Sequence, residues 1–135
     1  MSAVAAAVAD THALIFHAIR SRRLGRRAAA HFDATELRQA LTYVPAAVIW
    51  EVAFLAKTGR GDLRRPAREF FADLFSNPSY QPYDITPAQA FTAAELGFGR
   101  DPFDALVCAA AIGLELPLIT RDTEIVASRA VRVIW

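Results

Sequence analysis

Four acidic residues spread along the chain could together bind a metal ion. Asp10 and Asp122 each follow a short apolar run typical of a buried strand, and Glu51 and Asp104 lie near the beginnings of expected helices. In a parallel α/β sheet the helices begin at the carboxyl edge of the strands, where such folds bind ligands. We therefore expect the four carboxylates to lie close together at that edge, with Asp104 and Glu51 projecting from first helical turns.

Such a cluster predicts a particular chemistry. Two unit charges ~5 Å apart at an effective dielectric of ~20 repel by roughly 3 kcal/mol, so several clustered acids need protons or a cation. Oxygen ligands without His or Cys favour Mg²⁺ or Mn²⁺ over zinc. A metal held in this way orients a water, lowers its pKa and neutralises charge on a phosphate, which suits phosphodiester hydrolysis with one metal ion or two.

Each acid also has a structural explanation. Asp10, Asp101 and Asp122 stand where helices can begin, and aspartate is a favoured N-cap. Asp104 and Glu51 would complement the dipole at the beginning of a helix. Capping explains each position singly, but it does not explain four acids at one edge where no basic residue is obviously placed to neutralise them.

The elements that must position these acids alternate along the chain. Apolar runs and turn residues predict strands at 4–9, 43–46, 80–85, 117–120 and 131–135. Periodicity, caps and prolines predict helices at 11–20, in a stretch ending at 41, and at 47–57, 66–75, 86–97 and 101–113. This alternation predicts an α/β fold of three α/β/α layers around a short, mainly parallel sheet, formed as one domain by residues 1–135.

Composition limits the function classes. The chain has 135 residues, of which 54% are hydrophobic, but no run is apolar and long enough to span a membrane, and no basic leader precedes Asp10. We expect a cytoplasmic protein. The net charge of +1 excludes a global basic field. Cys108 is the only cysteine, which excludes an internal disulfide and a cysteine-based zinc site. It lies among apolar neighbours and is expected in the core.

Other candidate motifs are weak. Asp10 lacks the second aspartate two residues later that aspartyl-phosphate phosphatases need, and the sequence has no Walker-type glycine loop. His12, His17 and His31 have no ligand-like spacing and are interpreted as structural or exposed. Arginines gather at 20–27 and 60–68, where they either face RNA or cover solvated helices. The candidates for RNA contact are Arg22, Arg23, Arg26 and Arg64.

Four segments, in this order and spacing, resemble a known family. Val8-Ala9-Asp10-Thr11-His12-Ala13-Leu14 resembles the opening of PIN domains, and Ile49-Trp50-Glu51-Val52-Ala53 resembles their second acidic helix. The segment 101–111, DPFDALVCAAA, resembles a variant common among VapC-type toxins, and 116–122, LPLITRD, follows at the usual distance.

The resemblance implies a compact PIN fold and Mg²⁺- or Mn²⁺-dependent endonuclease cleavage of RNA. It implies that Asp10, Glu51 and Asp104 are the main metal ligands, and that Asp122 is a fourth acid that acts directly or through water. Neighbouring hydroxyls at Thr11 and Thr120 would support this cluster. Asp101 is left open between a catalytic role and a helix cap alone.

The resemblance also implies a homodimer and an antitoxin partner, whose carboxyl-terminal segment packs across an apolar groove. The aromatic stripe of Phe70, Phe71, Leu74 and Phe75 could include groove residues, although at least half of it is expected to be core. Two other interpretations remain open: a PIN nuclease of RNA processing or decay, and a catalytically inactive PIN binding module.

Overall fold

The computed structural model describes residues 4–61, 63–98 and 101–135. Its centre is a five-stranded sheet in the order β3-β2-β1-β4-β5, in which every neighbouring pair is parallel. The α/β prediction is therefore confirmed, and the sheet is wholly rather than mainly parallel. The strands are β1 (Ala5–Ala9), β2 (Ala40–Pro45), β3 (Tyr80–Tyr83), β4 (Leu118–Ile119) and β5 (Val133–Ile134).

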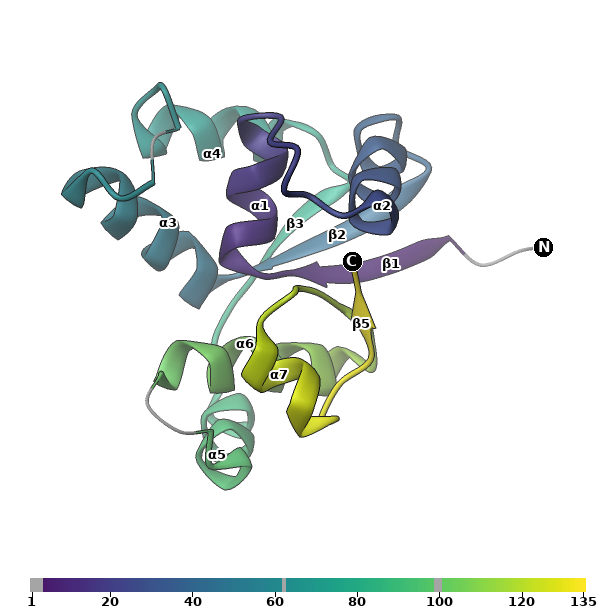
Figure 1. Ribbon diagram of the computed structural model, residues 1–135, viewed down its shortest axis with the longest axis vertical. Coiled ribbons are helices and arrows are strands. Elements are labelled where there is room, and N and C mark those ends of the chain that lie inside the picture. Colours follow the sequence, from purple (N-terminus) through teal and green to yellow (C-terminus); the bar gives the residue numbers. More distant parts are fainter. Residues whose placement is uncertain (1–3, 62, 99–100) are drawn as a thin grey trace.

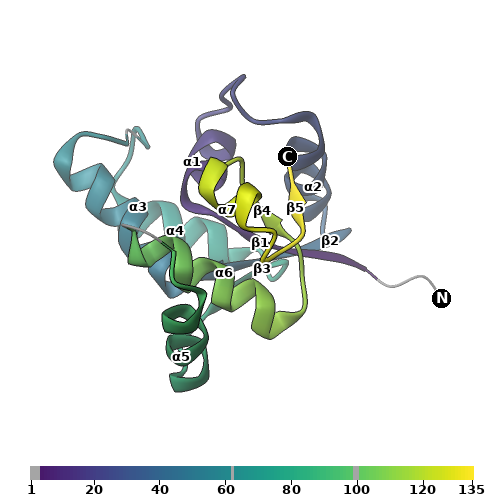
Figure 2. The same ribbon diagram turned by 60° about the horizontal axis from the view of Figure 1, so that its bottom comes forward.

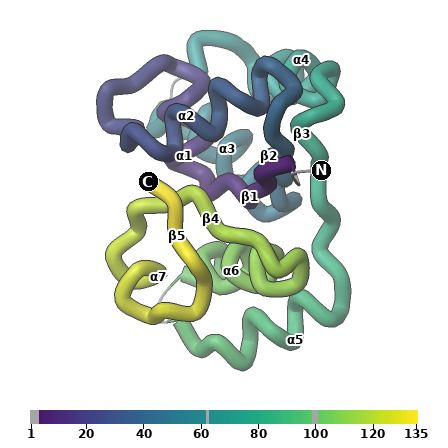
Figure 3. Tube along the Cα trace, turned by 90° about the vertical axis from the view of Figure 1, so that its right-hand side faces the viewer, coloured from purple at the N-terminus to yellow at the C-terminus, as the bar shows by residue number. Residues whose placement is uncertain are grey.

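Helices cover both sides of this sheet. Figures 1 and 3 show α1, α2 and α4 on one side and α5, α6 and α7 on the other. Figure 2 shows α5 outside α6, against which it packs. The helices are α1 (Thr11–Ala18), α2 (Arg26–Glu36), α3 (Ala46–Thr58), α4 (Ala67–Ser76), α5 (Pro87–Leu96), α6 (Pro102–Leu114) and α7 (Thr123–Ser128).

The strand order creates a switch point between β1 and β4. From β1 the chain proceeds through β2 to β3 in one direction, whereas β4 and β5 lie on the other side of β1. The connections after β1 and β4 therefore leave in opposite directions and open a crevice at their carboxyl ends, which is where α/β sheets bind ligands. Asp10 follows β1 directly and Thr120 follows β4 directly.

The expected helix signals are present at several ends. Asp10, Thr86, Asp101 and Asp122 are N-caps whose side chains accept a backbone N–H. These bonds satisfy donors that a helix start otherwise leaves unpaired. Gly59 ends α3 at a φ of 75°, a conformation that glycine adopts without a steric penalty.

Several predicted boundaries were wrong, and two of them are ends of helices. The second helix ends at Glu36 instead of continuing to Leu41, because Arg38 takes a left-handed φ of 61° and Leu41 pairs with Ala6 in the sheet. Gly113 does not close the sixth helix, since α6 continues to Leu114 and turns at the next residue. At Leu41 strand pairing outweighs the local propensity for helix.

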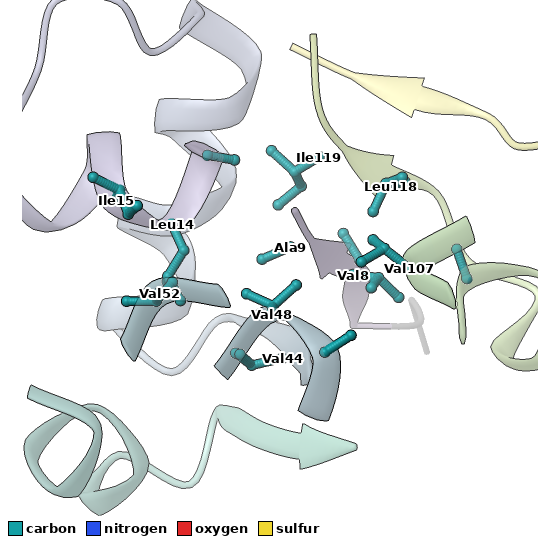
Figure 4. Close-up of a cluster of buried hydrophobic side chains, with 14 of the residues drawn as sticks. Val8, Ala9, Leu14, Ile15, Val44, Val48, Val52, Val107, Leu118 and Ile119 are labelled. Atoms are coloured by element: carbon teal, nitrogen blue, oxygen red, sulfur yellow. The ribbon is translucent and has the colours of Figure 1, made fainter. Parts of the chain in front are cut away.

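The core lies between the sheet and the helices. Figure 4 shows Val8 and Ala9 of β1 between Leu14 on one side and Val107 on the other. Cys108 is fully buried, as expected, and burial together with nearby carboxylates raises the pKa of its thiol to about 12. Within the described ranges, no helix is both long and apolar enough to cross a membrane.

Candidate metal centre

A cavity of about 310 Å³ opens at the carboxyl ends of β1 and β4. Its walls come from the loops after these strands and from α1, α3 and α6. The four acids predicted to converge all line it, together with the acid whose role the sequence left open. The five carboxylates are those of Asp10, Glu51, Asp101, Asp104 and Asp122.

Asp10 is the most enclosed of these acids, with 8% of its surface exposed. Its Oδ1 accepts the backbone N–H of Thr11 at 2.8 Å, and its Oδ2 accepts the hydroxyl of Thr120 at 2.6 Å. Burial raises the pKa of Asp10; the two hydrogen bonds oppose that effect, and the charge of Glu51 adds to it. The carboxylate is therefore fixed in position and poorly solvated, as a ligand held ready for a cation would be.

Asp104 has a different environment. It stands in the first turn of α6, as predicted, and accepts no hydrogen bond from the described residues. Partial burial raises its pKa to about 7, and the charges of Asp122, Asp101, Asp10 and Glu51 add to the effect. A carboxyl whose four acidic neighbours all disfavour its ionisation lies in a region of uncompensated negative charge.

One threonine joins the two strands that carry the site. The hydroxyl of Thr120 donates to Asp10 and accepts the backbone N–H of Asp122 at 3.1 Å. Asp122 in turn caps α7 by accepting the N–H of Ile125 at 3.0 Å. Thr120 thus supports the cluster through its hydroxyl, whereas Thr11 contacts Asp10 through its backbone.

Glu51 lies in the second turn of α3, which begins at Ala46, and not in the first turn as expected. An aromatic stack fixes α3 against α6 beside it. The ring of Trp50 lies 4.9 Å from that of Phe54 and 5.0 Å from that of Phe103, with both pairs within 9° of parallel. Residues adjacent in sequence to Glu51 and Asp104 thereby hold their two helices together.

The cavity fits a hydrated magnesium or manganese ion better than a closed metal cage. No three His, Cys, Asp or Glu side chains of the described ranges lie close enough together to form a preassembled site. Mg²⁺ usually keeps several waters and binds through only one or two carboxylates, so it does not require a preassembled site. The carboxylate-rich lining, the uncompensated charge at Asp104 and the open volume suit such an ion.

Five further residues line the cavity that the sequence did not assign to the site: His12, Ala13, Phe16, Arg121 and Trp135. His12 is exposed, as expected, but its position after Asp10 places it at the rim. Arg121 lies between two residues of the site and could have been selected on that ground. No sequence pattern pointed to Trp135 as a cavity residue, because its location depends on the pairing of β5 with β4.

The remaining histidines have structural partners, as predicted. His31 contacts the hydroxyl of Thr42 at 3.0 Å, and His17 stacks on Phe32 at 4.5 Å. None of the four arginines proposed for RNA contact lines the acidic cavity. The guanidinium of Arg23 lies 5.9 Å from the ring centroid of Phe16, which does line the cavity.

Thr120→Val is expected to lower the free energy of unfolding by about 1–3 kcal/mol, because the buried Oδ2 of Asp10 loses its donor. Thr120→Ser keeps the hydroxyl and should lose far less. Chemical denaturation at pH 7 measures both variants. Equal stability of the valine and serine variants would show that the hydrogen bond to Asp10 contributes nothing.

A second cavity, of about 750 Å³, lies between α1, α2 and α4. Phe70 and Leu74 line it, whereas Phe71 and Phe75 do not. Phe71 is buried in the core and lies in ring contact with its two aromatic neighbours on α4. The stripe is therefore divided, with one half facing the cavity and the other half packed inward, as expected of at least half of it.

Solved structures of toxin–antitoxin systems have the same fold. VapBC2 from Rickettsia felis, bound to a promoter DNA fragment, is 12% identical with a TM-score of 0.68, over 95% of this chain and 96% of that one. DNA-bound VapBC from Salmonella typhimurium is 14% identical with a TM-score of 0.67, over 97% of each chain. Mycobacterium tuberculosis VapC20, a sarcin–ricin loop cleaving toxin, is 14% identical with a TM-score of 0.65, over 95% of this chain and 98% of that one.

At these identities the similarity concerns the fold, and no curated protein sequence matches the chain significantly. The family assignment depends instead on the PIN domain model, which matches residues 7–130. That range contains all five carboxylates of the cavity. Because the match extends over nearly the whole sequence, the chain belongs to the PIN domain family.

Proposed function

We propose that this protein is a Mg²⁺- or Mn²⁺-dependent endoribonuclease that acts as the toxin of a VapBC-type toxin–antitoxin pair. PIN domains are typically nucleases, and the chain's fold neighbours include VapC toxins. The observation that carries the proposal is the convergence of five carboxylates on one cavity at the switch point of the sheet. No basic side chain within the described ranges forms an ion pair with any of them.

In this proposal Asp10, Glu51 and Asp104 are the metal ligands, directly or through waters that the ion keeps, and Asp122 contributes directly or through a water. A bound divalent cation supplies Lewis-acid stabilisation of the phosphate and lowers the pKa of a coordinated water. The protein's contribution is to fix the positions of the carboxylate ligands. Asp10 is fixed by two hydrogen bonds, and Asp104 has no competing donor among the described residues.

The test is cleavage of a labelled RNA in the presence of Mg²⁺ or Mn²⁺, compared with the same reaction in EDTA. Wild type should cleave only with metal, and Asp10→Ala and Asp104→Ala should not cleave. Equal activity in all three proteins would reject the catalytic assignment. A metal-independent activity that survives in both variants would indicate a contaminating nuclease.

We further propose that an antitoxin segment binds in the larger cavity between α1, α2 and α4. Its walls combine apolar side chains, including Phe70 and Leu74, with charged ones such as Arg20 and Asp33. Mixed walls of this kind suit a short amphipathic segment. Its apolar side chains would pack on the apolar walls, and its polar side chains would contact the charged residues around them. Two of the fold neighbours are toxin–antitoxin complexes bound to DNA.

Phe70→Ala is expected to weaken binding of the antitoxin about 10-fold or more, since a partly exposed aromatic ring that lines a groove is a typical anchor. The probe is the purified product of a short open reading frame beside this gene, and calorimetry measures the affinity. Glu69→Gln is the control, because Glu69 is exposed on the same helix outside the cavity. Unchanged affinity in a folded Phe70→Ala protein would remove this surface from the proposal.

We also propose that the protein is cytoplasmic and, as the resemblance to VapC-type toxins implies, a homodimer. Large hydrophobic side chains exposed on α3 provide apolar surface for it. Trp50 is 51% exposed and Phe54 is 43% exposed, although they stack on each other. Exposed apolar surface of this kind commonly marks an interface.

A further inference from the structure

The guanidinium of Arg121 lies over two aromatic rings that line the acidic cavity. The centre of its guanidinium lies 5.1 Å from the ring centroid of Phe16 and 5.5 Å from that of Trp135. These separations are within the range of cation–π attraction, which orients the guanidinium without using its N–H donors. The arrangement fixes one arginine beside five carboxylates.

The same guanidinium forms no ion pair with the acids around it. Asp122 is its neighbour in sequence and lines the same cavity, yet the ion pairs in the described part of the chain are elsewhere, His17–Glu36 and Arg65–Asp73. Arg121 is also exposed. None of its five N–H groups forms a hydrogen bond with the described residues, and the side chain lines the acidic cavity.

The ring that completes this arrangement is itself anchored. The carbonyl oxygen of Trp135 accepts the backbone N–H groups of Arg27 at 3.0 Å and Ala28 at 3.3 Å, at the beginning of α2. A Cβ at Gly25 would lie 2.5 Å from Trp135, so only glycine allows this close approach. The indole also meets Phe16 edge to face at 6.3 Å. The position of the guanidinium is thus set by α1, α2 and the last strand together.

We infer that Arg121 binds a phosphodiester of the RNA substrate adjacent to the acidic cavity; this inference rests on the proposed nuclease function. An RNA backbone that approaches five carboxylates is repelled unless cations offset their charge, and Arg121 supplies a fixed cation beside the proposed metal ion. A planar guanidinium with free donors forms two parallel hydrogen bonds to phosphate oxygens. Arg121 is then a substrate-binding residue that attracts the RNA backbone to the rim of the acidic cavity.

The experiment measures binding separately from cleavage. A labelled single-stranded RNA is titrated with the full chain carrying Asp104→Asn, which prevents turnover, in Mn²⁺ and at several salt concentrations. Adding Arg121→Met should raise Kd about 10-fold. It should also reduce the slope of log Kd against log salt by about 0.7, because one phosphate contact is lost. In the otherwise wild-type chain the same substitution should raise KM more than it lowers kcat.

Two further variants separate this role from a structural one. Arg68→Met removes the same charge from an exposed position on α4 that lines neither cavity, and it should leave Kd and the slope unchanged. Arg121→Lys keeps the charge but loses the planar fork, so the slope should be retained while Kd rises. If Arg121→Met unfolds the protein, Arg121→Lys is the test instead. A smaller slope of log Kd against log salt in the lysine variant than in the Asp104→Asn chain would then overturn the inference.

The failures of the two proposals are distinguishable. An Asp104→Asn chain that binds RNA equally well with arginine or methionine at position 121 overturns the inference and leaves the nuclease proposal intact. A chain that neither binds nor cleaves RNA with any metal overturns both. A change confined to antitoxin affinity would assign Arg121 to the partner instead.

Discussion

Asp104→Asn is expected to reduce metal-dependent RNA cleavage by about 10²–10⁴-fold and to leave the fold intact. The substitution keeps the size of the side chain and its place in the first turn of α6, but it removes the charge that the proposed cation needs. Cleavage of a labelled RNA over a range of Mn²⁺ concentrations measures the effect.

The same substitution should stabilise the metal-free protein at neutral pH. Asp104 has its pKa raised from 3.8 to about 7 in the folded state, so the stability it contributes is present below pH 3.8 and lost as the pH rises through 7. A fully enclosed carboxyl would lose about 4 kcal/mol, and partial exposure of this one reduces the expected loss to about 1–2 kcal/mol. Thermal melts between pH 4 and 8 in EDTA should show this decline in wild type and less of it in Asp104→Asn.

Glu124→Gln is the matched control, because Glu124 is an exposed acid in the first turn of α7 and does not line the cavity. It should change neither the cleavage rate nor the pH dependence of stability. Wild-type activity in Asp104→Asn would contradict the metal role. An Asp104→Asn protein that is less stable than wild type at pH 8 would contradict the electrostatic description of the cavity.

Phe71→Ala is expected to lower the free energy of unfolding by about 3–5 kcal/mol. The ring is 8% exposed and lies in ring contact with Phe70 and Phe75, at 5.0 Å and 5.7 Å, within the main core cluster. Its truncation would leave a void that the surrounding helices and sheet can only partly close. Urea denaturation monitored by tryptophan fluorescence measures the loss.

Phe70→Ala provides the comparison, since Phe70 is half-buried and lines the larger cavity. Phe70→Ala should lower the free energy of unfolding less than Phe71→Ala does, and it should weaken antitoxin binding more. If both variants lost stability equally, the division of the stripe into a core half and a cavity half would be wrong.

Much of the fold could be predicted because its signals are local. The N-caps at Asp10 and Thr86 and the prolines at the beginnings of α5 and α6 are visible in single segments. The boundaries that failed depend on distant partners. Leu41 belongs to β2 only because β1 lies beside it, which no local periodicity reports.

The acids of the site were predictable for a related reason. Asp10 and Asp122 follow strands. In a parallel sheet the carboxyl ends of all strands lie at the same edge, whatever the strand order. Phe16 and Trp135 were not predictable as cavity walls, because they approach the acids only through the pairing of β4 with β5 and the packing of α1. The chemistry of the site was thus visible in residue types, while its walls depend on tertiary structure.

The hydrogen bond from Thr120 to Asp10 also constrains when the site can form during folding. Its two residues are separated by 110 positions, so it requires the closure of a very long chain segment. Parallel pairings between distant strands form late and slowly compared with local helices. A chain still emerging from the ribosome would carry Asp10 and Glu51 well before β4 could pair with β1. The acidic cavity is therefore assembled only after β4 has been synthesised, and a product truncated before β4 would contain α1 to α6 but not the centre.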